Sequence, residues 1–130
     1  MDRFRILVVD DELLIRDMLY DFFVAQEWDI VVTEDGYKAI DYLKNRPFDV
    51  VLTDIKMPDM NGLELTGKIR SLHDGLPVVL MTGYPSLDTA LEALRYKVDD
   101  YIIKPFNVNH LYKVVREIAS ARRKATTEAV

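Results

Sequence analysis

The sequence contains no cysteine, only two histidines and no long hydrophobic run, and these absences exclude several classes of protein. Without cysteine there is no disulfide framework, no thiol nucleophile and no cysteine-based zinc site. Charged residues interrupt every apolar stretch well before the ~20 residues that a membrane-spanning helix needs. The N-terminus leads straight into a strand pattern, which is not typical of a signal peptide. We therefore expect a cytoplasmic domain without membrane contact.

What the chain does contain indicates one folded, mildly acidic domain. Its 130 residues suffice for a real core, and 49% hydrophobic with 30% charged residues favours a globular chain over a disordered one. The formal net charge of -5 disfavours a non-specific nucleic-acid surface, so we predict no direct nucleic-acid binding. We expect the domain to span 1–121. The polar end, 122–130, should be a frayed tail, beginning to fray at Ala121, or the start of a linker.

Apolar runs alternate five times with segments of helical periodicity. The runs lack polar alternation, which is typical of parallel strands covered on both faces. The expected strands are 6–9, 29–33, 50–54, 78–81 and 101–103, and a helix follows each of them. On the fourth helix, which starts at Pro85-Ser86, spacing indicates an inward face made by Leu87, Ala90, Leu91 and Leu94. The pattern predicts an α/β fold: a five-stranded parallel sheet, order 2-1-3-4-5, with five helices on both faces.

Chemically capable side chains stand where four of these strands end. Asp10 and Asp11 follow the first strand, Asp54 ends the third, and Thr82 and Lys104 follow the fourth and fifth. Ligand sites of parallel α/β sheets lie beyond the carboxyl ends of the strands, so these groups should meet. A carboxylate nucleophile near a cation suits phosphoryl transfer, in which lysine and threonine stabilise phosphoryl oxygens.

Clustered carboxylates repel one another and need a nearby cation. Magnesium prefers oxygen ligands and often bridges carboxylates and phosphate, so Asp10, Asp11 and Asp54 are candidate Mg²⁺ ligands. Zinc is disfavoured because His73 and His110 lie far from the strand ends.

Four segments make the sequence similar to the receiver (phosphoacceptor) domain of bacterial two-component response regulators. They are 8–12 (VVDDE), 54–62 (DIKMPDMNG), 81–84 (MTGY) and 100–106 (DYIIKPF). The resemblance covers about residues 4 to 120 and implies the flavodoxin-like receiver fold. Residues 81–90 most resemble receivers of enhancer-binding transcriptional activators, which implies a role in transcription regulation.

The resemblance also implies a role for each motif residue. Asp54 would accept a phosphoryl group from a sensor histidine kinase or a histidine phosphotransfer protein, and Thr82 and Lys104 would bind the phosphoryl oxygens. The domain would promote its own phosphorylation and dephosphorylation, and would not act as an enzyme on a free substrate. The implied Mg²⁺ ligands are Asp10, Asp11, Asp54 and the backbone carbonyl of Lys56.

A conformational switch is implied as well. The Lys104–Pro105 peptide bond would be cis. On phosphorylation Thr82 would move inward and Tyr101 would change from exposed to buried. The face made by the fourth helix, fifth strand and fifth helix would then shift its population toward one of two pre-existing conformations. That face would control homodimerisation or an output domain.

One position departs from the family, and three alternatives stay open. The family usually has a Gly-Ala pair where Lys97 and Val98 stand, so the cap of the fourth helix should be strained or different. A flavodoxin-like cofactor binder would need a phosphate-cradling loop where Asp10-Asp11-Glu12 stands. A haloacid-dehalogenase-type phosphatase would need an acid at Lys56. A receiver that signals without phosphorylation would not need the acid, threonine and lysine set.

Overall fold

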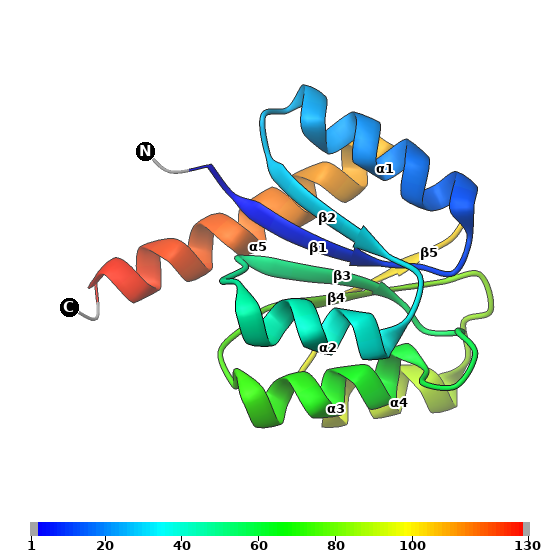
Figure 1. The fold of residues 1–130 in the computed structure, drawn as a ribbon. Coiled ribbons are helices and arrows are strands. Elements are labelled where there is room, and N and C mark those ends of the chain that lie inside the picture. Colours follow the sequence, from blue (N-terminus) through cyan, green and yellow to red (C-terminus); the bar gives the residue numbers. More distant parts are fainter. Residues whose placement is uncertain (1–2, 129–130) are drawn as a thin grey trace.

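The computed structural model describes residues 3–128, in which five strands and five helices alternate (Figure 1). The elements are β1 (Arg5–Val9), α1 (Leu13–Ala25), β2 (Asp29–Thr33), α2 (Gly36–Asn45), β3 (Val50–Asp54), α3 (Gly62–Leu72), β4 (Val78–Thr82), α4 (Leu87–Arg95), β5 (Asp100–Ile103) and α5 (Val108–Glu128). Even α5, the longest helix in this part of the chain, lacks the apolar stretch needed to span a membrane, as do the other described helices.

All strand pairs are parallel and the sheet order is β2-β1-β3-β4-β5, which confirms the predicted fold. Successive residues of a strand point to opposite faces, so each buried strand contributes to two cores. Leu7 and Val9 pack with α2, α3 and α4, whereas Ile6 and Val8 pack with α1 and α5. Both layers of helices are visible on either side of the sheet (Figure 1). This double cover explains why every residue of β3 is buried.

The prediction that the leucines of α4 face the core is wrong. Leu87, Leu91 and Leu94 are 75%, 52% and 73% exposed, whereas Ala93 is buried. Helical spacing correctly groups the leucines on one side, but periodicity cannot say which side meets the sheet. The small Ala93 packs against the sheet, so an apolar stripe remains on the outer surface of α4.

The end of α4 contains the predicted irregularity. Lys97 has a φ of 59°, the left-handed conformation that favours glycine. The N–H of Lys97 donates to Leu94 O and the N–H of Val98 to Ala93 O, both at 3.1 Å, which is a Schellman cap. Arg70 of α3 donates to Tyr96 O at 3.0 Å and to Lys97 O at 2.9 Å. The cap therefore forms without glycine and is reinforced by a neighbouring helix.

The C-terminal helix is longer than expected. We predicted fraying from Ala121, but α5 continues to Glu128. Its extra turns are held to the domain, because Arg122 donates to Phe48 O at 2.8 Å and Arg123 pairs with Asp49 at 2.9 Å. Val130 and its neighbour at 129 lie outside the described residues, and a domain boundary at 121 stays a prediction.

Candidate functional site

Asp54 is delivered to the rim of the sheet by the fully buried strand β3. Its side chain is 7% exposed. The following loop folds back so that the N–H of Gly62 donates to Ile55 O at 2.7 Å. A Cβ at position 62 would lie only 2.1 Å from Asp54 O, so only glycine permits this close approach. Local backbone geometry thus keeps Asp54 at the mouth of the site.

Lys104 connects the acids that end β1 and β3. Its ammonium nitrogen lies 2.7 Å from Asp10 Oδ2, 3.0 Å from Glu12 Oε1 and 3.3 Å from Asp54 Oδ2. The predicted cis peptide bond between Lys104 and Pro105 is present. Residues that are 50 and 94 positions apart from Lys104 in sequence therefore share one cation, as the strand-end argument predicted.

Burial and mutual repulsion disfavour the ionised acids. Burial raises the pKa of Asp54 from its ordinary 3.8 to about 6, and the Asp10 carboxylate adds to this rise while Lys104 opposes it. Burial likewise raises the pKa of Asp10, against the lowering effect of its hydrogen bond from Lys104. Burial alone would lower the pKa of Lys104, but its bonds to Asp10 and Glu12 raise it overall. One lysine thus leaves the acids incompletely neutralised.

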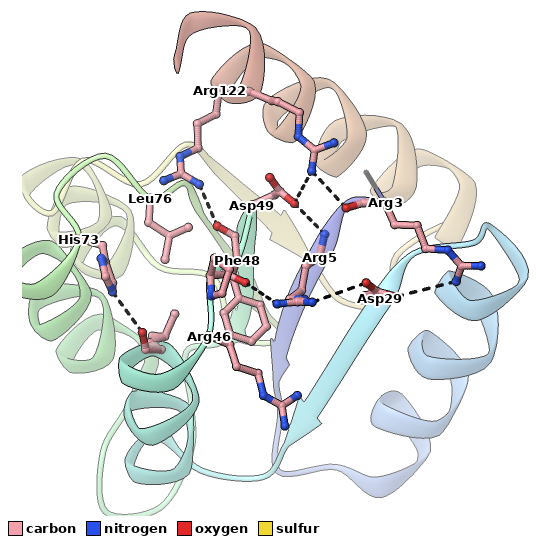
Figure 2. A pocket seen from close by; sticks show the side chains of 12 residues that line it. Arg3, Arg5, Asp29, Arg46, Phe48, Asp49, His73, Leu76 and Arg122 are labelled. Carbon is pink, nitrogen blue, oxygen red and sulfur yellow. Dashed lines mark hydrogen bonds and ion pairs between the residues drawn. The ribbon is translucent and has the colours of Figure 1, made fainter. Parts of the chain in front are cut away.

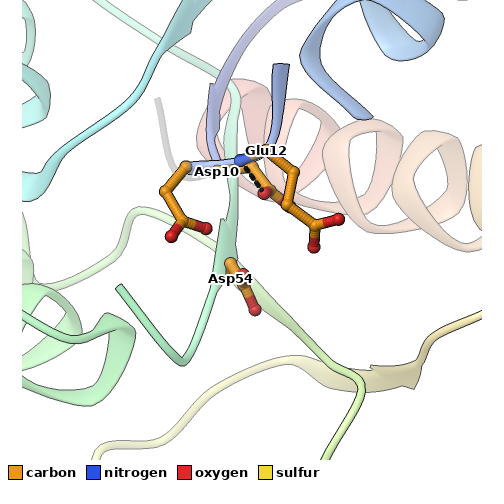
Figure 3. A group of neighbouring side chains, drawn as sticks. Asp10, Glu12 and Asp54 are labelled. Carbon is orange, nitrogen blue, oxygen red and sulfur yellow. Dashed lines mark hydrogen bonds between the residues drawn. The ribbon is translucent and has the colours of Figure 1, made fainter. Parts of the chain in front are cut away.

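The carboxylates form a cluster suited to a divalent cation. Ligand oxygens of Asp10, Asp11, Glu12 and Asp54 all lie within 4.8 Å of one another. Figure 3 shows three of these side chains at the ends of β1 and β3, with the N–H of Glu12 donating to Asp10 Oδ1 at 2.9 Å. All donors are hard oxygens, which fits Mg²⁺. Glu12 was missed as a site residue, although its position directly after Asp10-Asp11 was a signal.

The remaining predicted residues surround this cluster. Thr82, 2% exposed, accepts a hydrogen bond from the N–H of Tyr84 at 3.0 Å. Lys56 is exposed, with its ammonium 4.6 Å from the centre of the Tyr84 ring. Tyr101 is half-buried, and its hydroxyl lies 3.0 Å from Thr89 Oγ1. The aromatic residue predicted to switch therefore contacts the first turn of α4.

Residues 6–116 match the response regulator receiver domain family. The chain belongs to this family. The match runs from β1 into α5, so it covers most of the described residues, and it confirms the predicted family. It also rules out the flavodoxin-like and dehalogenase-type alternatives.

Known regulators resemble this receiver domain along most of its length. Regulatory protein AtoC of Escherichia coli K12 is 41% identical over 112 residues, covering 86% of this chain and 24% of AtoC. Response regulator protein PilR of Pseudomonas aeruginosa is 35% identical over 129 residues, covering 99% of this chain and 29% of PilR. These relatives confirm the predicted likeness to receivers of enhancer-binding activators. The chain spans about a quarter of the length of such relatives.

Solved receiver structures share the fold. A CheY-like receiver domain from Methanospirillum hungatei JF-1 has a TM-score of 0.92 at 31% identity, covering 95% of this chain and 99% of that one. The response regulator TrrA of Thermotoga maritima, in complex with Mg²⁺-BeF, has a TM-score of 0.80 at 33% identity, with 88% and 98% covered. This chain is therefore a receiver domain of the kind that two-component response regulators contain.

Proposed function

We propose that Asp54 is the phosphorylated residue of this receiver domain. The donor is a phosphohistidine of a sensor histidine kinase or of a histidine phosphotransfer protein. The observation that carries the proposal is the placement of the Asp54 carboxylate at the end of β3, 3.3 Å from the Lys104 ammonium and within the acid cluster. A buried acid beside a lysine and further carboxylates has the components that phosphoryl transfer requires.

The transfer exchanges one bond to phosphorus for another. A carboxylate oxygen of Asp54 attacks the phosphorus, the P–N bond to the donor histidine breaks, and that imidazole keeps the electron pair and takes up a proton. With a pKa of about 6, Asp54 is mostly ionised at neutral pH and can act as the nucleophile. Lys104 neutralises charge on a phosphoryl oxygen, and the Thr82 hydroxyl can donate to another because it accepts from Tyr84 N–H.

The acid cluster supports Mg²⁺ as the cofactor. Asp10, Asp11 and Asp54 would hold the ion, with Glu12 and the Lys56 carbonyl as further oxygen donors. When bound, Mg²⁺ supplies positive charge to the phosphoryl oxygens. Calorimetric titration should show weaker Mg²⁺ binding by Asp11→Ala than by the wild type. Unchanged affinity would argue against Asp11 as a ligand.

Mass spectrometry after incubation with acetyl phosphate and Mg²⁺ tests the phosphorylation site. The wild type should gain one acid-labile phosphoryl group, and Asp54→Asn should gain none. Asp59→Asn is a matched control, since Asp59 is an exposed acid in the loop after β3 and asparagine tolerates its φ of 68°. Full labelling of Asp54→Asn would refute the assignment. A wild type that stays unlabelled would favour the alternative of a receiver that signals without phosphorylation.

We infer further that phosphorylation acts through the face of α4, β5 and α5. Thr82 would move toward the phosphoryl group and Tyr101 would become buried, favouring the active one of two pre-existing states. The exposed Leu91 of α4 and Ile103 of β5, 52% and 53% exposed, support an association surface there. The outcome would be homodimerisation or control of an output domain in transcription regulation, in the cytoplasm.

Sedimentation with and without beryllofluoride and Mg²⁺ tests this inference. The wild type should gain mass when beryllofluoride is added, and Leu91→Asp should not. Leu14→Asp introduces the same charge at an 81%-exposed leucine of α1 and should behave as the wild type. If the wild type keeps the mass of a monomer, the switch does not work by self-association.

A further inference from the structure

A second polar site lies at the end of the sheet opposite Asp54. It is a pocket of about 520 Å³ beside the start of β1, the loop before β3 and the C-terminal turns of α5 (Figure 2). Asp49 lines this pocket immediately before β3, whereas Asp54 is the last residue of the same strand. The two sites are therefore separated by the length of β3 and share no residue.

The pocket concentrates positive charge on an acidic protein. Five arginines but only two aspartates line it, although the chain as a whole has a formal net charge of -5. The arginines come from distant parts of the sequence, namely Arg3, Arg5, Arg46, Arg122 and Arg123. Such an excess of one sign in a concave site attracts ligands of the opposite sign.

The two aspartates neutralise only part of this charge. Asp29 lies 3.8 Å from both Arg3 and Arg5, and Asp49 lies 2.9 Å from Arg123. Arg46 and Arg122 form no ion pair with a carboxylate among the described side chains. Arg46 lies over the Tyr42 ring at 5.4 Å, and Arg122 donates to the backbone oxygen of Phe48. Both guanidinium groups keep their net charge and further N–H donors.

The floor of the pocket is apolar. Leu43, Phe48 and Leu76 line it and are 3%, 6% and 3% exposed. Figure 2 shows Arg122 and Arg46 on either side of Phe48. Charged side chains outnumber these apolar ones around the pocket, so its lining fits a charged ligand with an apolar part better than a purely apolar one. Guanidinium groups bind carboxylates and phosphates through two parallel hydrogen bonds, which a neutral ligand cannot use.

We propose that this pocket binds a small organic anion, one with carboxylate or phosphate groups on an apolar body. The anionic groups bind Arg46 and Arg122, and the apolar body packs over Phe48. Because Arg122 belongs to α5 and Arg46 to the loop before β3, a bound anion fastens the C-terminal turns of α5 to the rest of the domain. The site is independent of Asp54 and does not require its phosphorylation.

Calorimetry and amide NMR shifts of the full chain test the proposal in metal-free, low-salt buffer. The probes are isophthalate, which has two carboxylates on a ring, and phenyl phosphate, and their comparison distinguishes the two anion chemistries. Benzyl alcohol is the uncharged control. At least one anion should bind, shifting amides of 43–49, 73–76 and the last turns of α5, whereas benzyl alcohol should not bind.

Variants distinguish a built site from a general attraction to positive charge. Arg46→Gln with Arg122→Gln should weaken anion binding at least tenfold, and lysine at both positions should weaken it less, because lysine keeps the charge but loses the planar fork. Arg95→Gln with Lys113→Gln removes the same charge from exposed positions on α4 and α5 and should leave affinity unchanged. Should Arg122→Gln perturb folding, Arg46→Gln alone suffices, since Arg46 is exposed.

Four results would overturn the proposal. The first is no binding of either anion at millimolar concentration, and the second is an equal loss of affinity in the control pair. The third is a set of shifts centred on the loops around Asp54. Binding of an acidic peptide or a nucleic acid in place of both small anions would also refute it. Asp54→Asn should bind the anion as the wild type does, which separates this test from that of the phosphorylation site.

Discussion

Replacing Asp54 by asparagine should stabilise the metal-free protein at neutral pH, because the native site disfavours the ionised acid. A pKa raised from 3.8 to about 6 corresponds to a penalty of about 3 kcal/mol, at ~1.4 kcal/mol for each pH unit. Asparagine is nearly isosteric and keeps an oxygen that can accept from Lys104. The penalty should therefore disappear with the charge, and the free energy of unfolding of Asp54→Asn should be up to about 3 kcal/mol higher than that of the wild type.

The pH dependence of this gain has a definite sign. Between about pH 4 and 6 the folded state holds a proton on Asp54 that the unfolded state has lost, so the wild type loses stability as pH rises through this window. Below about pH 4 both states are protonated and the penalty vanishes. The advantage of Asp54→Asn should consequently be near zero at pH 3.5 and complete at pH 7.5.

Urea denaturation at these two pH values in metal-free buffer measures the effect. Asp21→Asn, at an exposed position of α1, controls for the change in net charge. Mg²⁺ adds a second arm, because an ion that binds only the folded wild type at about 100 times Kd stabilises it by about 2.7 kcal/mol. The two proteins should then approach equal stability at pH 7.5. A gain for Asp54→Asn that is absent, or the same at both pH values, would refute the electrostatic account.

Three further substitutions test the backbone that positions the site and α4. Gly62→Ala should lower the free energy of unfolding by at least about 3 kcal/mol and abolish phosphorylation, because the added Cβ would collide with Asp54 O. Gly75→Ala is the control, because a Cβ there meets open space, and its free energy of unfolding in the same urea titrations should stay within about 0.5 kcal/mol of the wild type. Lys97→Gly should stabilise the protein by about 1 kcal/mol, because glycine adopts the left-handed backbone of this position without strain. Lys68→Gly, inside α3, should destabilise the protein by a similar amount. The opposite order of melting temperatures would contradict the strain argument. Arg70→Met should lower the free energy of unfolding by about 3 kcal/mol and speed hydrogen exchange of the α4 amides, because the carbonyls of Tyr96 and Lys97 lose their donor. Unchanged exchange rates would show that Arg70 does not hold the end of the helix.

The sheet and the convergence of the acids were predictable because both follow from rules that local sequence expresses. A continuous apolar run such as Ile6 to Val9 indicates a buried parallel strand, and strand order then determines which polar residues share a rim. Asp10, Asp54 and Lys104 were therefore expected together before any distance was known. The pKa of Asp54 was not predictable, because it depends on the balance between burial, the Asp10 charge and a single ammonium group.

The fourth helix shows why the remaining features could not be predicted. Three leucines at helical spacing identify one face of α4, but local sequence cannot distinguish a face that meets the sheet from one that meets a partner. The contact of α4 with the sheet is made by the small Ala93, and Arg70, 26 residues away from Tyr96, holds its last turn. Few large side chains thus anchor α4 to the core, while its leucines remain exposed. A helix held by a small residue and hydrogen bonds can change position at lower free energy than one that buries three leucines, which suits the element proposed to carry the signal.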